Sequence, residues 1–420
     1  MFTRYHYTII ALCLVIAVDG MSMGLIWPMF GQLFINKSSV FLAADTSIHL
    51  RNIFYGLTLA IFNVGLLFGA PLLGDISDCI GRRKVLLVCL YGTSLSLGIC
   101  ALGVMIKSIL LLFFGRVVLG VLAGSQALAQ AAIVDISSKQ HKMVNLSLLA
   151  LANEVGFIIG PLLGGLLIDN KLVSFFNLTT PFIAAVLIAL ANGVFLMVVF
   201  KETFTPKNNQ LTLKLSKGWN VFVEAFVRKK VRLLAIIYLC LNFGFALYFQ
   251  FVVIYLIRFY HYTGAQVGYF ISTMTVIAAL SFLWLVRLAQ RYFSLQHMAS
   301  YFLLITALSV GFTFCSSTWV AWICLLPLGI SSVIAYMAIL TLFSEVVARD
   351  EQGWVMGVSS AICAVGWGGS AMVIGLIGAF STPVTFLFAG TILLLGAVLG
   401  MRERFLFPTV DVHGVSRSES

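Results

Sequence analysis

Twelve long apolar stretches dominate this sequence, and they constrain its fold more than any other feature. Each stretch is close to the ~20 residues that an α-helix needs to cross about 30 Å of hydrocarbon. In order they are 7–30, 52–73, 84–106, 108–133, 144–168, 178–200, 231–257, 264–286, 297–316, 319–344, 353–379 and 381–401. The sequence therefore predicts an all-α polytopic membrane protein with 12 transmembrane helices.

The composition excludes several other classes of protein. Only 10% of the residues are charged and the mean hydropathy is +1.05, whereas about a quarter of the residues in a soluble domain are charged. The net charge of +11 lies in short loops and forms no single patch, so we expect no nucleic-acid partner. The eight cysteines form no Cys-x-x-Cys pair, and no nucleophile or phosphate-binding motif is present. We therefore expect no metal, no cofactor and no enzyme activity.

The distribution of lysine and arginine predicts the orientation in the membrane. An even number of helices places both termini on one side, and 20 of the 26 basic residues lie in loops on that side, against five on the other. Basic loops stay in the cytoplasm. We expect an integral protein of the inner or plasma membrane with both termini cytoplasmic. The first apolar run continues to Phe34, which is too long for the core of a cleavable signal.

The longest connection divides the twelve helices into two groups of six. The predicted units are an N-terminal half (1–200), a cytoplasmic linker (201–230), a C-terminal half (231–402) and a cytoplasmic tail (403–420). A shift of 210 residues places Gly156 on Gly366 and Gly165 on Gly375, as a duplicated six-helix unit would.

The linker itself has two open interpretations. Its apolar residues recur at spacings of three or four, as in Trp219, Phe222 and Phe226. This spacing is typical of an amphipathic helix on the cytoplasmic surface near anionic lipid. A loosely ordered tether would tolerate the same residues.

The connection between the second and third helices is a short charged segment, Gly74–Leu86. Gly74 and Gly81 would allow tight turns, and Asp78 stands close in sequence to Arg82 and Arg83. We interpret the segment as the tip of a hairpin of two antiparallel helices, acting either as a topology signal alone or as part of a gate.

Three charged residues lie deep in the apolar stretches: Asp19, Arg116 and Glu154. Counting along the helices places each of them about 12–18 Å from a helix end, near the middle of the membrane. A charge facing lipid at that depth costs roughly 3 kcal/mol or more. The three are therefore expected to share a polar cavity, where Arg116 either pairs permanently with one acid or controls a carboxyl that exchanges protons.

The fifth stretch contains a cluster of small residues: Gly156, Gly160, Pro161, Gly164 and Gly165. Glycines let two membrane helices approach closely, and a proline inside a helix removes a hydrogen bond and permits a bend. The cluster suits a seam at which two halves of a protein move against each other.

These segments together resemble the major facilitator superfamily. Gly74–Leu86 resembles its signature loop, with one departure, because Cys79 stands where the family usually has Arg or Lys. The segment that begins at Asp19, the Arg-x-x-x-Gly pattern at Arg116 and the glycine cluster at 156–165 resemble the drug:proton antiporter branch, which includes tetracycline and multidrug efflux proteins.

The resemblance implies a monomeric, proton-coupled efflux antiporter that exports a small organic solute or drug by alternating access. Its partners would be this solute, protons and membrane lipid. It also implies that Asp78 contacts the eleventh helix near Gly353 and that Asp19 carries the proton beside Arg116. In the second half, residues such as Gln250, Tyr336 and Trp367 would give an apolar wall with few polar groups.

Two alternatives remain open. The first is a proton-coupled importer of a nutrient or siderophore on the same fold. The second is a transporter-like membrane sensor that transports nothing.

Overall fold

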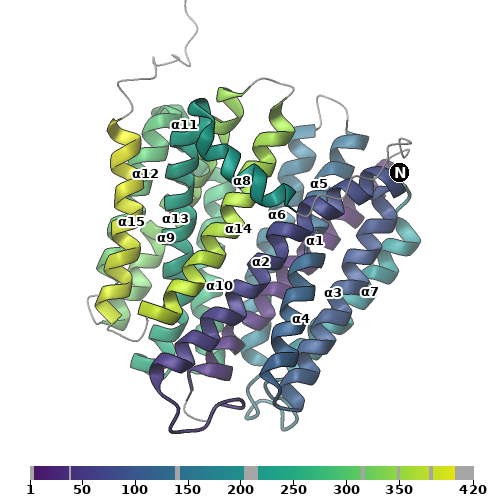
Figure 1. The fold of residues 1–420 in the computed structure, drawn as a ribbon, viewed down its shortest axis with the longest axis vertical. Helices are drawn as coiled ribbons and strands as arrows, with labels where there is room; N and C mark the ends of the chain where they lie inside the picture. Colours follow the sequence, from purple (N-terminus) through teal and green to yellow (C-terminus); the bar gives the residue numbers. More distant parts are fainter. Residues whose placement is uncertain are drawn as a thin grey trace, which may run out of the picture.

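The computed structural model describes residues 4–36, 39–137, 142–202, 216–313, 317–347, 351–377 and 382–402. Figure 1 shows the long helices side by side, with one short helix, α8, crossing them near the end where the N-terminus lies. The elements are α1 (Arg4–Phe34), α2 (Ile48–Ile80), α3 (Arg82–Met105), α4 (Ile109–Leu122), α5 (Ser125–Ile136), α6 (Lys142–Leu166), α7 (Thr180–Val199), α8 (Lys217–Val227), α9 (Lys229–Tyr260), α10 (Gly264–Leu280), the π-helical turn η1 (Ser281–Leu285), α11 (Val286–Tyr292), α12 (Leu295–Phe312), α13 (Thr318–Val346), α14 (Gln352–Ile377) and α15 (Thr382–Arg402).

Twelve spans in the described part of the chain are long and apolar enough to cross a membrane, which confirms the predicted all-α, twelve-helix class. Two of the spans are not continuous α-helices. The fourth is broken between α4 and α5 at Ala123 and Gly124. The eighth contains η1, where the Ser281 hydroxyl donates a hydrogen bond to the Ile277 carbonyl at 2.7 Å. Such local breaks in membrane helices often mark functional positions.

The glycine cluster packs α6 directly against α1. A Cβ atom on Gly160 would lie 2.6 Å from the Met21 carbonyl oxygen, and Gly156 and Gly164 approach the α1 backbone even more closely. Only glycine, whose side chain is a single hydrogen, fits at these contacts. Because lipid supplies no hydrophobic force between helices, close backbone packing of this kind is a main source of helix association in membranes.

The same helix also contacts the second group of six helices through α10. A Cβ atom on Gly165 would lie 2.5 Å from the Gly264 carbonyl oxygen, and Gly268 lies against the Pro161 carbonyl. The Ser272 hydroxyl donates a hydrogen bond of 2.8 Å to the Ile158 carbonyl. Thus α6 joins α1 within the first six helices to α10 in the last six.

Helix α14 repeats this arrangement 210 residues later. Gly366 lies against Asn242 of α9, as Gly156 lies against α1, and Gly375 lies against Ile53 of α2, as Gly165 lies against α10. The seventh and eighth spans correspond to the first and second spans under the same shift. The sequence repeat therefore corresponds to a repeat in packing.

Hydrogen bonds join the two groups of helices toward the end opposite the N-terminus. The Tyr55 hydroxyl of α2 donates to the Gln250 carbonyl of α9 at 2.9 Å, and Arg258 donates to the Asn52 side chain at 3.2 Å. Tyr55, Asn52 and Gln250 are all buried. This end of the seam between the halves is therefore closed.

Adding one methyl group at the α1–α6 contact tests the packing. We expect Gly164→Ala to lower the free energy of unfolding by about 1–3 kcal/mol, because the new methyl meets the Leu25 backbone, which cannot turn away. Thermal unfolding of purified protein in detergent measures the change.

The matched control is Gly311→Ala in α12, because a Cβ at Gly311 meets no atom within 4 Å. Its effect should stay within about 0.5 kcal/mol. Equal effects of the two substitutions would show that the α1–α6 contact is looser than described.

Candidate functional site

Asp19 lies beside the break between α4 and α5. The Ser125 hydroxyl donates a hydrogen bond to Oδ2 of Asp19, and Ser125 is the first residue of α5. The first N–H groups of a helix lack partners within the helix and carry partial positive charge. A carboxylate in the middle of the first span is thus placed at the positive end of a broken helix.

Glu154 lies at the same level as Asp19. Helices α1 and α6 run parallel, because Gly20 packs against the Asn153 carbonyl and Gly24 packs against Pro161. Glu154, which follows Asn153, therefore lies at about the same height in the bundle as Asp19. Both side chains are partly exposed. Its charge is also within electrostatic range of Tyr336 on α13 in the second group of helices.

Arg116 lies elsewhere, which corrects the prediction that it is the neighbour of Asp19. Its Nε donates to the Thr58 carbonyl at 3.1 Å, and its guanidinium lies 4.9 and 4.7 Å from the ring centroids of Phe30 and Phe62. Eleven residues of α1 separate Asp19 from Phe30, which corresponds to about 16 Å along the helix axis. The three charges therefore do not lie at one depth.

The surroundings of Arg116 are unusual for a buried cation. The side chain is 3% exposed and its Nη1 atom has no hydrogen-bond partner. In the part of the chain that the structure describes, no ion pair joins Arg116 to a carboxylate. Two aromatic faces replace the expected anion, and cation–π contacts of desolvated groups contribute about 2 kcal/mol.

Aromatic rings from both groups of helices meet along α1, between Asp19 and the closed end of the seam. Trp27 of α1 lies 5.0 Å from Phe249 of α9 and 6.2 Å from Trp367 of α14, between ring centroids. Phe245 lies 6.4 Å from Trp367. Trp27, Trp367 and Phe245 are each partly exposed. We call these four residues the aromatic cluster.

The charged segment between α2 and α3 is almost entirely helical. Gly74 lies inside α2, where a Cβ would meet no neighbouring element within 4 Å, so the prediction of a turn at Gly74 was wrong. The turn is made by Gly81 alone, at φ +104°, a value that favours glycine. Glu202, at the end of the sixth span, accepts hydrogen bonds from the backbone N–H groups of Arg82 and Arg83 at 2.9 and 3.1 Å.

Asp78 pairs within its own segment, and the contact expected near Gly353 involves residues outside the described side chains. Its carboxylate lies 2.6 Å from Nη1 of Arg82, and the same guanidinium reaches Asp135 of α5 at 3.3 Å. At the start of α14, the side chains of Glu351 and Trp354 contact the linker helix α8 and its C-cap residue Arg228. Helix α8 therefore lies against the end of α14 to which the resemblance assigned Asp78.

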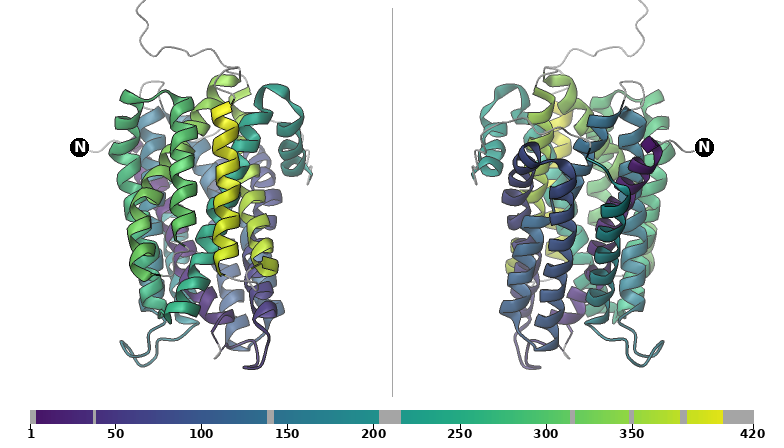
Figure 2. Two further views of the ribbon diagram at one scale, coloured as in Figure 1. Left: turned by 90° about the vertical axis from the view of Figure 1, so that its left-hand side faces the viewer. Right: turned by 90° about the vertical axis from the view of Figure 1, so that its right-hand side faces the viewer.

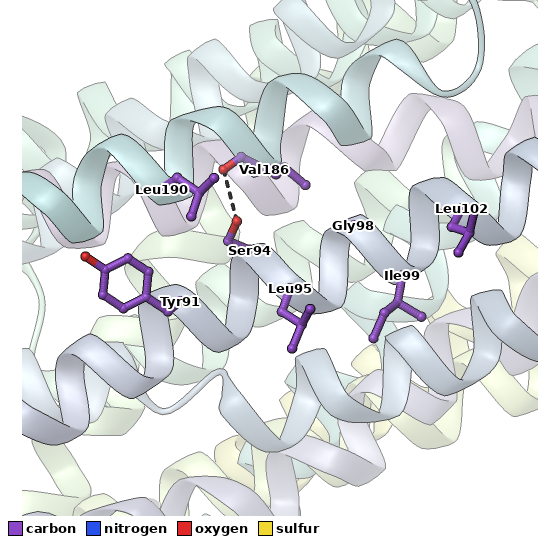
Figure 3. A pocket seen from close by; sticks show the side chains of 8 residues that line it. All are labelled: Tyr91, Ser94, Leu95, Gly98, Ile99, Leu102, Val186 and Leu190. Carbon is purple, nitrogen blue, oxygen red and sulfur yellow. Dashed lines mark hydrogen bonds between the residues drawn. The ribbon is translucent and has the colours of Figure 1, made fainter.

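A hollow of about 500 Å³ lies away from these residues, between α3 and α7. Figure 3 shows its lining and the hydrogen bond of 3.2 Å that Ser94 donates to the Val186 carbonyl. The lining is Tyr91, Ser94, Leu95, Gly98, Ile99, Leu102, Val186 and Leu190. It holds no charged group, and Leu95 is 66% exposed on the outer wall. The hollow is therefore a lipid-facing groove and not the candidate site.

Sequence reasoning missed Ser125 and the contact that Glu202 makes with the turn at Gly81. A lone serine in an apolar stretch follows no motif, although a Gly-Ser pair in the middle of a span is a signal of a helix break. Glu202 contacts a turn that lies 120 residues earlier in the chain, and no local pattern reports such a contact.

The fold defines the chain as a polytopic membrane protein, and its match to a transporter family places it among transporters rather than enzymes. A sequence profile described as Major Facilitator Superfamily matches residues 12–371. The chain therefore belongs to the Major Facilitator Superfamily.

Two groups of relatives are similar in sequence. Tetracycline resistance protein, class H, of Pasteurella multocida is 29% identical over 202 residues, which cover 47% of this chain and 45% of that protein. Multidrug resistance protein 1 of Bacillus subtilis (strain 168) is 23% identical over 358 residues, 84% of this chain and 87% of that protein. The chain thus spans about half the length of the tetracycline resistance proteins that it matches.

Solved structures with the same fold include transporters of different kinds by their names. The crystal structure of the human organic anion transporter MFSD10 (TETRAN) matches with a TM-score of 0.72 at 17% identity, over 95% of this chain and 100% of that chain. That of a D-xylose-proton symporter matches with a TM-score of 0.75 at 14% identity, over 95% and 97%. At such identities the likeness shows the fold alone.

The separation of Asp19 from Arg116 is testable with double-mutant cycles. We expect Asp19→Asn and Arg116→Gln to change the free energy of unfolding independently, with a coupling below about 0.5 kcal/mol, because the two side chains share no partner among the described residues. Thermal unfolding of the two single variants, the double variant and the wild type gives the coupling.

The positive control is the cycle of Asp19→Asn with Ser125→Ala, whose side chains share a hydrogen bond. Its coupling should exceed that of the first cycle. A coupling above about 1 kcal/mol between Asp19 and Arg116 would restore the predicted pair.

Proposed function

We propose that this chain is a proton-coupled antiporter that exports a small organic solute or drug by alternating access. The observation that carries the proposal is the position of Asp19. It is a carboxylate in the middle of the membrane, bonded to Ser125 at a helix break and without a fixed cation partner among the described residues. Such a group can bind and release a proton without breaking an ion pair.

Glu154 is the second proposed proton group. It lies beside Asp19 on the neighbouring helix and within electrostatic range of Tyr336 in the other half. We propose that it titrates as a separate site from Asp19, at the same level of the neighbouring helix. Arg116 is proposed to act separately, as a buried positive charge that can attract an anionic part of the substrate.

The direction of transport rests on the relatives. The sequence relatives are named for tetracycline resistance and multidrug resistance, which supports export of an aromatic or amphipathic solute. The aromatic cluster also supports this class, because flat rings stack on Trp and Phe faces. The D-xylose-proton symporter with the same fold is 14% identical and supports no direction.

We propose that residues 1–200 and 231–402 are the two moving halves and that both termini are cytoplasmic, in the inner or plasma membrane. The closed end of the seam would then face outward. The segment with Gly74, Asp78, Gly81, Arg82 and Arg83 would act in gating at the cytoplasmic end. We propose that the protein functions as a monomer and needs no nucleic acid.

Membrane lipid is the remaining proposed partner, at the outer face of α8. Trp219, Val223 and Val227 follow one another at helical spacing and are 48%, 42% and 70% exposed. Lys229 and Lys230 are exposed directly after them. An apolar stripe beside lysines suits the surface of an anionic leaflet.

The proton-carrying role of Asp19 predicts an effect on coupling and not on folding. Asp19→Asn should fold, because a neutral side chain in the membrane is less costly than a charged one. It should abolish transport driven by a pH gradient. Purified wild-type protein in detergent should release protons when substrate is added near neutral pH, because binding and deprotonation are linked.

Asp19→Asn should release none, and Glu154→Gln should release fewer protons or shift the pH of release. Asp169→Asn, in the loop after α6, is the control and should behave like the wild type. If Asp19→Asn still releases protons and Glu154→Gln releases none, Glu154 and not Asp19 carries the proton. Unchanged proton release from both variants would refute the carboxylate mechanism.

The orientation predicts the accessibility of two exposed positions. In a background without native cysteines, Asn220→Cys in α8 should react with an impermeant maleimide only after the membrane is opened. Ala44→Cys, in the loop between α1 and α2, should react in intact cells. Labelling of position 220 from outside would invert the topology.

A further inference from the structure

Helix α8 lies across the seam between α2 and α14. Figure 1 shows it crossing in front of both helices, and the two views of Figure 2 show it on the flank of the bundle. Gly218 of α8 touches the Leu67 carbonyl of α2 so closely that a Cβ could not be added, and Phe222 packs with Leu67 and Ala364 of α14. The inner face of α8 therefore contacts both halves at once.

One end of α8 is joined to α2 by an ion pair. Nζ of Lys217 lies 2.6 Å from Oδ1 of Asp75, and the two side chains are 48% and 27% exposed. Lys217 is the first residue of α8, and Asp75 is in the last two turns of α2. This pair links the linker helix to the first half.

The other end of α8 is joined to α14 by a four-residue cluster. Nη1 of Arg228 lies 2.7 Å from Oε1 of Glu351, and Nη2 and Nε of Arg228 contact Oε1 of Glu224 at 2.7 and 2.9 Å. The Arg228 guanidinium also lies 3.9 Å from the ring centroid of Trp354, whose Nε1 donates to Oε2 of Glu224 at 3.0 Å. One guanidinium thus uses its edge for two carboxylates and its face for an aromatic ring.

The ionisation of Glu224 agrees with this arrangement. Although partial burial alone would raise the pKa of this carboxyl, the hydrogen bonds from Arg228 and Trp354 lower the pKa below its ordinary value. Glu224 therefore stays charged at neutral pH, and Arg228 faces two anions, Glu224 and Glu351.

The position of these contacts gives them a mechanical meaning. Direct contacts between α2 and α14 continue from Ile53 and Gly375 at the closed end to Leu67 and Ala361. Beyond that point α8 contacts both helices. When two halves rock about a central seam, the distance between helices of opposite halves changes most at the two ends of the bundle. Any such motion must stretch or release the contacts of α8.

We propose that α8 is a brace that stabilises the conformation described here, and that Arg228 is the positioning residue that fastens it to α14. The brace consists of the Lys217–Asp75 pair and the cluster of Glu224, Arg228, Glu351 and Trp354. The proposal rests on the alternating-access part of the proposed function and not on protons, substrate or direction. Loss of a brace that exists in one conformation shifts the population toward the other.

The experiment measures the opening of the seam at its closed end. Val253 is completely buried there against Gly31, so Val253→Cys in a cysteine-free background reacts with an aqueous maleimide only when that end opens. Arg228→Ala should raise the labelling rate roughly two- to fivefold, the range expected for half-exposed ion pairs. Arg228→Lys should give an intermediate rate, because it keeps the charge but loses the planar fork.

Two controls separate a brace from a general loss of structure. Arg232→Ala removes a nearby exposed cation, which is outside the brace and the proposed lipid surface, and should label at the wild-type rate. A second reporter, Ala307→Cys, is buried between α12 and α15 within one half. It should stay unreactive in every variant, whereas unfolding would expose it.

A charge swap tests the other end of the brace and does not depend on Arg228 variants folding. Lys217→Asp alone should raise Val253→Cys labelling, and the double variant Lys217→Asp with Asp75→Lys should restore the wild-type rate. Wild-type labelling in both Arg228→Ala and Lys217→Asp would overturn the brace.

The labelling needs no substrate and no pH gradient, so its outcome is independent of the proton-release test. If proton release fails while Arg228→Ala still opens the seam, only the proposed coupling is lost. If proton release holds and the seam does not open, only the brace is lost.

Discussion

The structure depends on backbone contacts at glycines along two helices, α6 and α14. Each of them packs against the first helix of its own half and against the second helix of the other half, through Gly156 and Gly165 in α6 and Gly366 and Gly375 in α14. Small residues allow a contact area with no interlocking side chains. Such a surface can join two halves tightly and still allow them to rotate, which interdigitated leucines would resist.

This constraint also explains where the polar groups lie. Because glycine contacts keep α1 and α6 parallel and close, Asp19 and Glu154 are brought to one level, with the break between α4 and α5 beside Asp19. Arg116 faces α2 and two aromatic rings nearer the closed end. The acids and the cation thus belong to different regions of the first half. The aromatic cluster of Trp27, Phe245, Phe249 and Trp367 connects the two halves, and it lies between the acids and the closed end of the seam.

The sequence predicts the membrane spans and the glycine contacts of α6 because both depend on local signals. Hydropathy reports each helix by itself, and glycines at spacings of four report a helix face. The relation of Asp19 to Arg116 could not be predicted this way, since counting from uncertain helix ends ignores the tilt of each helix and the extra length of α1, which runs from Arg4 to Phe34. The contact of Arg228 with Glu351 joins residues 123 positions apart, for which a single sequence carries no signal.

The absence of an arginine beside Asp19, within the described residues, changes how a proton could be controlled. A movable cation would couple protonation to the breaking of an ion pair. The positive end of α5 is instead part of the helix scaffold, so its field at Asp19 persists when side chains rearrange. What changes when the halves rock is the access of water to the carboxylate, because hydration stabilises its charged form. Under the proposed mechanism, seam opening and proton binding would be two consequences of one motion, with the Ser125 hydroxyl holding the carboxylate in place during both.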